Sequence, residues 1–246
     1  MTDRVKLALH NGRDLFGAER DVEAEVQFRL AVSLDPKNVE AWYNLGLALY
    51  ALKKLDESKD AFKNVAFLNP YRADVYIATG IILKDEGKCA EAESSFRQAL
   101  RVDPDNPHAY HQLSVFCGET GRWEEARAAA KRLIELRPTE EVGYWALIGA
   151  CQELKRYAEQ IDASRAASRL NPHSLPSLEG LAWTCAETGN HQEAVAALSR
   201  AIQINPELPH LHAWLAESFA ELGNSQGAAD ELKALALLDP QLATEV

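Results

Sequence analysis

The sequence predicts an all-α protein in which seven antiparallel helix pairs stack into a solenoid. Three observations predict this fold: prolines that return at a fixed spacing, apolar residues with a helical period between them, and glycines that recur in phase near the middle of each interval. A short helix pair cannot bury its apolar face alone, so consecutive pairs are expected to cover one another.

Proline marks the end of each repeating unit. An apolar segment, followed in most units by Asp or Asn, comes directly before it. Because proline disfavours helix in the preceding residue, each of these sites is expected to stop a helix. The prolines, which are equally spaced along the chain without a slip, are Pro36, Pro70, Pro104, Pro138, Pro172, Pro206 and Pro240.

Within each unit the helical pattern is interrupted once. The second unit reads Trp42-x-x-Leu45-Gly46-x-x-Leu49, then Ser58-x-x-x-Phe62, then Pro70, and the first and third units close in the same way with Ala24/Phe28 and Ala92/Phe96. Glycine permits the positive φ that ends one helix and turns the chain back. Each unit is therefore expected to hold two helices joined by a tight turn. Glycine stands at this turn in four units, as Gly87, Gly121, Gly189 and Gly223.

This pattern resembles the tetratricopeptide repeat, which has an aromatic residue, Leu-Gly, Ala-x-x-x-Phe and Pro within about 34 residues. The prolines of this chain recur at the same interval. The resemblance covers nearly the whole chain and implies one domain, residues 1–246, wound as a right-handed α-α superhelix. Its units are expected at about residues 5–38, 39–72, 73–106, 107–140, 141–174, 175–208 and 209–242.

Two parts of the chain depart from the repeat. We use the word slot for a position that recurs once in every repeat. The slot where the paired helices cross holds a small residue in six units but Gln160 in the fifth, where Ser164 also replaces Phe. We expect a loosened joint there or a buried polar site. In the last helix, no repeat follows to cover Leu232, Leu235 and Leu238, which suggests self-association, excision from a longer protein, or a tolerated exposed edge.

Composition excludes several classes of partner. With 37 acidic and 26 basic residues, the net charge of −11 argues against binding nucleic acid or an anionic membrane. No apolar run is long enough to span a bilayer, and the polar N-terminus lacks a signal core. Four cysteines are too few for a disulfide scaffold. We expect a cytoplasmic protein.

Candidate catalytic residues are accounted for by the repeat. Cys117, Cys151 and Cys185 share one slot, so we expect three buried core thiols, whereas Cys89 falls near a turn. His108-x-x-His111 and His210-x-His212 lack a nearby third ligand and are expected to be surface or groove histidines. Motifs for phosphate binding, nucleophilic catalysis and zinc proteolysis are missing. The sequence predicts a non-enzymatic protein without metal or cofactor.

The resemblance implies that the first helix of each unit lines a concave groove that binds a peptide or helix from a partner protein. The first three units present an apolar strip there, and the last four present polar and aromatic residues. We expect a hydrophobic partner segment over the first zone and a neutral-to-basic segment over the second. These groove residues are Leu9, Phe16, Tyr43, Asn44, Leu47, Tyr50, Ile77 and Ile81, followed by His108, His111, Gln112, Trp145, Glu179, Trp183, His210, Trp214 and Glu217.

A carboxylate recurs in one slot of the first helices, near their ends. It is either a soluble helix former or an acidic ladder that steers a basic or amine-bearing segment. Trp145, Trp183 and Trp214 would then hold the aliphatic stems or make cation–π contacts. The slot holds Asp85, Glu119, Glu153, Glu187 and Glu221.

Few residues of this sequence fit the patterns of alternative functions. A subclass of the family binds acidic chaperone tails through a clamp in which Lys6 and Asn44 would fit, but His10, Asp74 and Ala78 depart from it. Glycosyltransferases of the family carry an asparagine ladder, for which only Asn44 fits. Self-association through the last helix is a third hypothesis. The leading one is a protein-binding scaffold.

Overall fold

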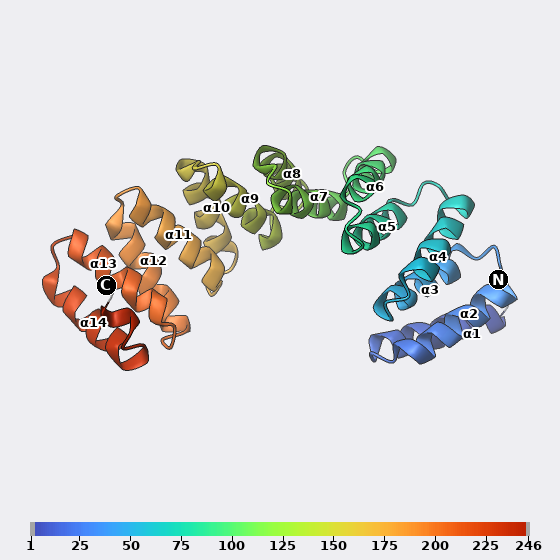
Figure 1. Cartoon of the computed structure of the whole chain (residues 1–246), viewed down its shortest axis with the longest axis horizontal. Helices are drawn as coiled ribbons and strands as arrows, with labels where there is room; N and C mark the ends of the chain where they lie inside the picture. Colours follow the sequence, from blue (N-terminus) through green and yellow to red (C-terminus); the bar gives the residue numbers. More distant parts are fainter. Residues whose placement is uncertain (1–2, 245–246) are drawn as a thin grey trace. The chain divides into compact units, whose positions relative to one another are not determined.

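The computed structural model describes residues 3–244, and in this range every regular element is helical (Figure 1). None of these helices is long and apolar enough to cross a membrane. The helices are α1 (Asp3–Gly17), α2 (Asp21–Leu34), α3 (Val39–Ala51), α4 (Leu55–Leu68), α5 (Ala73–Asp85), α6 (Cys89–Val102), α7 (Pro107–Glu119), α8 (Trp123–Leu136), α9 (Glu141–Glu153), α10 (Tyr157–Leu170), α11 (Leu175–Glu187), α12 (His191–Ile204), α13 (Pro209–Glu221), α14 (Ser225–Leu238) and the short 3₁₀ helix η1 (Leu242–Thr244).

The helices form two compact units, divided between residues 113 and 114 inside α7. In the N-terminal unit, α1 packs on α2, α3 on α4, and α5 on α6. In the C-terminal unit, α9 packs on α10, α11 on α12, and α13 on α14. The prediction of two helices per repeat is therefore confirmed. The expectation of one domain over the whole chain stays a prediction.

The second helix of each repeat ends two residues before its proline, as the sequence predicted. Thus α2 ends at Leu34 and α4 at Leu68. The carboxylate of Asp35 then accepts the backbone N–H of Lys37 at 3.2 Å, and the amide oxygen of Asn69 accepts that of Tyr71 at 3.1 Å. These side-chain turns stabilise the chain reversal that proline begins. Asn171, Asn205 and Asp239 do the same.

A polar ring six residues after proline fastens four of the loops to the helix that follows. The indole of Trp42 donates to the carbonyl of Pro36 at 2.9 Å, and the hydroxyl of Tyr76 donates to that of Pro70 at 3.1 Å. Tyr144 and His212 make the equivalent bonds to Pro138 and Pro206. One slot therefore satisfies a loop carbonyl with three different kinds of side chain.

The turn inside each repeat places one residue in the left-handed region. Gly87, Gly121, Gly189 and Gly223 have φ between 72° and 76°, which confirms the sequence prediction. The other three repeats use the same slot without glycine: Glu19, Lys53 and Lys155 have φ of 58°, 59° and 54°. A side chain in this region is strained, so these three turns carry a cost that the glycine turns avoid.

The fifth repeat reverses the large and small residues of its core. In the N-terminal unit, Phe62 fills the space beside Gly46 in the partner helix. The corresponding slots in the fifth repeat hold Ser164 and Ile148. Both lie beside Gly180, since a Cβ on that glycine would be 3.4 Å from Ile148 Cγ2 and 3.6 Å from Ser164 Oγ. Ile148 on the first helix thus supplies volume that phenylalanine supplies from the second.

The end of the last helix differs from its sequence prediction. Leu235 is fully buried although no repeat follows it, so the expectation that it lies uncovered was wrong. Its slot faces the core of its own repeat, as Leu133 and Ala201 do in earlier ones, and η1 packs against α13 and α14. Leu232 is half-buried, whereas Leu237 and Leu238 are 88% and 40% exposed.

Ion pairs join the second helices of successive repeats. Arg165 of α10 binds the Glu193 carboxylate of α12 through two nitrogens, at 2.7 and 2.6 Å. Lys131 of α8 pairs with Glu159 of α10 at 3.0 Å. The guanidinium of Arg165 lowers the pKa of Glu193, which keeps this carboxylate charged.

Candidate protein-binding groove

The predicted apolar strip forms a small pocket in the N-terminal unit. Leu47 and Tyr50 of α3 meet Ile81 of α5 around a space of about 80 Å³, which Phe62 and Ala78 complete. Four of the five lining residues come from the first helices of two successive repeats, and Phe62 comes from α4. A pocket of this size suits one small apolar side chain of a partner.

Other residues of that strip are already engaged. The guanidinium of Arg72 lies over the ring of Tyr43, 4.4 Å from its centroid, and burial raises the pKa of the Tyr43 hydroxyl to about 12. Phe16 packs partly buried against the core of the first repeats. The side-chain amide of Asn44 donates to the Glu40 carbonyl within its own helix.

Two residues that the sequence placed in the groove belong to the core instead. Leu9 is 4% exposed within the core of the first two repeats. Ile77 is 9% exposed and packs with Ala73, Ala99 and Ala109. Neither leaves much side chain for a partner to contact.

The first residue of the acidic slot is bound within the protein. Asp85 is exposed, and its carboxylate accepts a 2.6 Å hydrogen bond from the hydroxyl of Tyr50 in the preceding repeat. At α7, His108 is exposed, whereas His111 and Gln112 are half-buried. Burial, and then the charge of His108, lowers the pKa of His111, so its imidazole is neutral at physiological pH.

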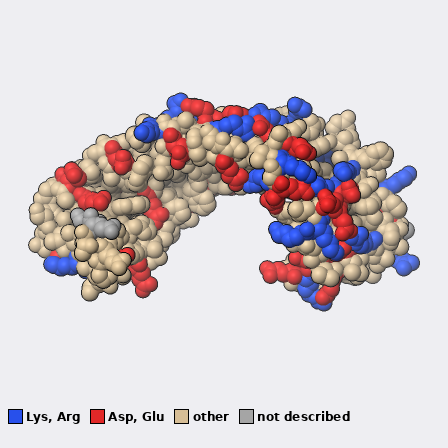
Figure 2. All heavy atoms as spheres, viewed as in Figure 1, with Lys and Arg blue, Asp and Glu red and all other residues tan. Residues whose placement is uncertain are grey.

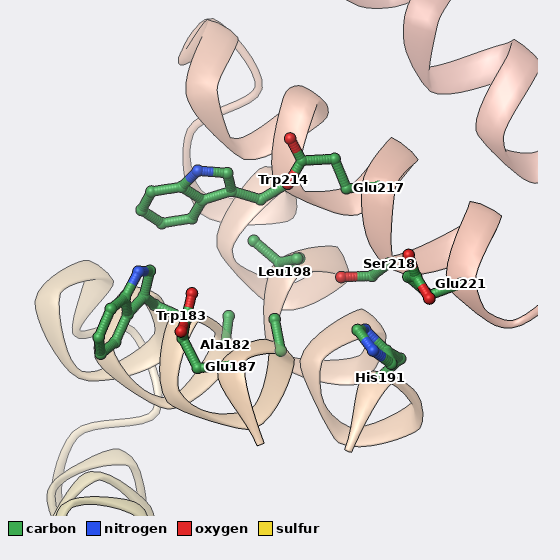
Figure 3. Close-up of a pocket in the computed structure, with 10 residues that line it drawn as sticks. Ala182, Trp183, Glu187, His191, Leu198, Trp214, Glu217, Ser218 and Glu221 are labelled. Atoms are coloured by element: carbon green, nitrogen blue, oxygen red, sulfur yellow. The ribbon is translucent and has the colours of Figure 1, made fainter. Parts of the chain in front are cut away.

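The largest group of predicted groove residues that the structure brings together lies in the C-terminal unit. A pocket of about 520 Å³ lies between α11 and α13, with α12 at its floor (Figure 3). Five predicted groove residues line it: Trp183 and Glu187 on α11, and Trp214, Glu217 and Glu221 on α13. Residues three, four and seven apart share a helix face, which is why these side chains point into one space. Ala182, Ala186, His191, Leu198 and Ser218 complete the lining.

The pocket is acidic. Its ten lining residues include three glutamates and neither lysine nor arginine. In residues 3–244, the structure gives Glu187, Glu217 and Glu221 no hydrogen bond or ion pair to another side chain. The helices around it extend this character, because residues 175–238 contain eight acidic residues against Arg200 and Lys233. Figure 2 shows few basic side chains on the visible face of this end, whereas the α1–α6 end shows both charges.

The remaining predicted residues of this unit lie outside the pocket. Trp145 is 43% exposed, and its indole N–H donates to Ser177 Oγ at 3.0 Å. Glu119 and Glu153 are exposed. His210 lies edge-on to Trp214, with ring centroids 5.2 Å apart, and contacts Glu179 at 3.1 Å.

His212 departs from the sequence prediction of a surface or groove histidine. It is 7% exposed, and its two ring nitrogens contact the Pro206 carbonyl and the Glu231 carboxylate. The slot explains its place, because it is the ring position that fastens the loop in other repeats. His212 is therefore a structural residue.

The cysteines follow their predicted places. Cys117, Cys151 and Cys185 are buried, Cys89 is exposed, and none of these four described residues forms a disulfide. Burial raises the pKa of Cys151 and of Cys185 to about 12, so neither is a nucleophile near neutral pH. Within residues 3–244, no group of three His, Cys, Asp or Glu side chains is placed to hold a metal ion.

Sequence reasoning missed His191, which opens α12 and lines the acidic pocket. A signal was present, because the same slot holds Trp123 and Tyr157 in the two preceding repeats. Tyr157 lies edge-on to Trp183, with ring centroids 6.4 Å apart. In the fifth and sixth repeats the first residue of the second helix therefore lies beside residues that the sequence predicted for the groove.

Comparisons with known proteins agree with the helix-pair architecture. The sequence matches profiles described as tetratricopeptide repeat over residues 83–151 and 186–245, over 39–72, and over 153–209. Among curated proteins, none matches the sequence significantly.

Three solved structures of similar fold are distant from this chain in sequence. One is the C-terminal part of a TPR repeat-containing protein from Cytophaga hutchinsonii, with a TM-score of 0.79 and 17% identity over 96% of this chain and 98% of that one. MamA has a TM-score of 0.64 and 20% identity over 70% and 94%. YrrB, described as a TPR protein with an unusual peptide-binding site, has a TM-score of 0.63 and 18% identity over 78% and 97%. At these identities the likeness shows the fold alone.

Proposed function

The chain belongs to the tetratricopeptide repeat family, and from this premise we propose that it is a non-enzymatic scaffold that binds a segment of a partner protein along its first helices. The observation that carries the proposal is the pocket between α11 and α13. It gathers two tryptophans and three unpaired glutamates from the first helices of two successive repeats, and two of these glutamates, Glu187 and Glu221, share one slot. Aromatic walls with a few charged groups are typical of recognition sites.

The side chains of each unit indicate which kind of partner segment that unit binds. Over the C-terminal unit the excess of carboxylates favours a basic segment. Over the N-terminal unit, the pocket of Leu47, Tyr50 and Ile81 favours an apolar side chain. The peptide-binding site described for YrrB, a protein of similar fold, supports peptide recognition as the mode.

The test is binding of the full chain to arrays of short peptides graded in net charge and apolar content. We expect basic peptides to bind best and to weaken as salt rises, because exposed charges are screened. Glu221→Lys is expected to weaken basic peptides at least tenfold. Glu207→Lys makes the same charge change in the loop before α13, outside the pocket, and is expected to have a much smaller effect. Tighter binding of acidic peptides would reject the proposal for this unit.

A matched pair of variants tests the proposal for the apolar pocket of the N-terminal unit. Leu47→Ser removes an apolar wall of the N-terminal pocket and is expected to weaken peptides that carry an apolar side chain. Val22→Ser changes a side chain that is 63% exposed on α2, a second helix, and should leave binding unchanged. Equal effects of both variants would show that the N-terminal pocket is not used.

Self-association is the second candidate function. Leu237 and Leu238 are exposed on α14 and could bury apolar surface against another copy. Light scattering over a concentration series separates self-association from partner binding by a monomer. A mass that rises with concentration, and falls back in Leu237→Ser, would favour assembly.

A further inference from the structure

We infer that the pocket between α11 and α13 receives one cationic side chain, a lysine or an arginine, with its aliphatic stem on the two tryptophans and its charge among the glutamates. This inference deepens the proposed function and rests on it. It names the chemical group that this unit recognises and the orientation of that group in the pocket.

The pocket has an aromatic end and a polar end. Figure 3 shows the indoles of Trp183 and Trp214 at one side, whereas His191, Ser218 and Glu221 lie together at the other. On α11, Glu187 follows Trp183 by four residues, a rise of about 6 Å along the helix axis. A flexible four-carbon stem spans a distance of this order, so one side chain can contact the indole and still reach the carboxylates.

The charge balance selects a cation. Three carboxylates line the pocket without a basic neighbour in the lining, and within residues 3–244 none has a side-chain partner. Elsewhere in this unit carboxylates are neutralised, as Glu193 is by Arg165 and Glu159 by Lys131. An arriving ammonium or guanidinium would supply the missing counter-charge, and the faces of the indoles would attract it as well.

A buried acceptor points the same way. Nδ1 of His191 is shielded from solvent and has no hydrogen-bond partner within the described residues. His191 stands at the polar end of the pocket, between α11 and α13 (Figure 3). In the neutral tautomer that carries its proton on Nε2, this nitrogen accepts a hydrogen bond from a cationic donor. An apolar occupant would leave both this nitrogen and the carboxylates unsatisfied.

The experiment measures the indole N–H resonances of the five tryptophans in the full chain, assigned with Trp→Phe variants. The probes are N-acetyl-lysine methylamide and N-acetyl-arginine methylamide. N-acetyl-norleucine methylamide has an apolar stem without the charge, and N-acetyl-glutamate methylamide has the opposite charge. We expect either cation to shift the resonances of Trp183 and Trp214 in a saturable way, while Trp42 in the other unit stays unchanged. The probe that binds more tightly shows whether the pocket prefers lysine or arginine.

Two variants link the shifts to the carboxylates. The double variant Glu187→Gln/Glu221→Gln is expected to lose the titration, and Glu207→Gln, which lies outside the pocket, should keep it. Shifts of the same size with norleucine would overturn the inference, since the pocket would then be merely apolar. Unshifted Trp183 and Trp214, in a chain that still binds basic peptides, would also overturn it while leaving the proposed scaffold standing. If the chain shows neither the tryptophan shifts nor binding of basic peptides, the proposed scaffold function is rejected for this unit as well.

Discussion

Gly46 lies directly against the ring of Phe62: a Cβ placed on this glycine would come within 2.7 Å of Phe62 Cε1. The first and third repeats make the same contact, at 2.5 Å, between Gly12 and Phe28 and between Gly80 and Phe96. The three phenylalanines are almost completely buried. Close approach of the paired helices in the N-terminal unit therefore depends on a glycine facing a large ring.

Gly46→Ala is expected to destabilise the protein despite alanine's higher helix propensity. The added methyl must displace a ring that is packed on all sides, and overpacking of this kind costs about 1–3 kcal/mol. The measurement is the urea midpoint followed by circular dichroism. Gly149→Ala is the matched control, because a Cβ there meets nothing within 4 Å in the middle of α9. It should stabilise by about 0.5–1 kcal/mol; a stabilising Gly46→Ala would contradict the packing argument.

The reversed pair of the fifth repeat predicts strong coupling between two substitutions. Ser164→Phe alone overfills the space beside Ile148, and Ile148→Gly alone leaves a cavity. Together they restore the glycine–phenylalanine arrangement of Gly80 and Phe96. The double variant is expected to be more stable than the sum of the single effects by about 1 kcal/mol or more. Additive effects in the urea midpoints would show that the two sites do not share one space.

The sequence predicted what the repeat period determines. Helix ends at Asp/Asn-Pro, turns at Gly87 and Gly189, and the buried thiol of Cys151 follow from local chemistry that recurs in each repeat. The period even contained the answer for Leu235, whose slot is buried in other repeats. The error there came from judging the last helix by its position in the chain instead of by its slot.

The groove was predicted less well, because exposure depends on neighbours in three dimensions. Helical spacing placed Trp183 and Trp214 on one face, and the structure brings them into one pocket. The same spacing placed Ile77 in the groove, but the following repeat buries it. His191 was missed because it comes from a second helix. Partners such as Tyr50 for Asp85 depend on how far one repeat is turned from the next, which spacing alone does not define.

Gln160 predicts a stabilising substitution. It is fully buried, and neither its amide nitrogen nor its amide oxygen has a hydrogen-bond partner within residues 3–244. Gln160→Leu removes two unsatisfied polar atoms and is expected to raise the stability by about 1–3 kcal/mol. In the same slot of the second repeat, Ser58 donates to the Gly46 carbonyl at 2.7 Å. Ser58→Ala should therefore lower the urea midpoint, and a destabilising Gln160→Leu would show that its amide is satisfied.

Lys155 predicts a gain of a different kind, because its φ of 54° lies where side chains are strained. Lys155→Gly is expected to stabilise the turn between α9 and α10 by up to about 1 kcal/mol, since relief of about 1–2 kcal/mol is partly offset by the flexibility of glycine in the unfolded chain. Gly189→Ala, in the same slot of the next repeat, should have the opposite sign. Thermal midpoints of both variants test this, and an unchanged or lower midpoint for Lys155→Gly would count against strain at the turn.

The hydrogen bond between Tyr50 and Asp85 predicts a shifted ionisation in the N-terminal groove. The bond from the hydroxyl to the carboxylate, together with burial and the negative charge of Asp85, raises the pKa of Tyr50 to about 12. A pKa raised on folding means that the bond stabilises the protein fully below pH 10, the ordinary value for tyrosine, and that this contribution is lost as the pH rises toward 12. Asp85→Asn removes the charge and should return the pKa of Tyr50 toward 10.

The measurement is the tyrosinate absorbance of each protein minus that of its Tyr50→Phe counterpart, which isolates Tyr50 among seven tyrosines. An unchanged pKa in Asp85→Asn would mean that burial, rather than the carboxylate, controls the hydroxyl. Because Tyr50 also lines the apolar pocket, the bond holds its ring beside Leu47 and Ile81. Asp85→Asn should therefore weaken peptides with an apolar side chain less than Leu47→Ser does, since a neutral amide oxygen can still accept the hydroxyl proton.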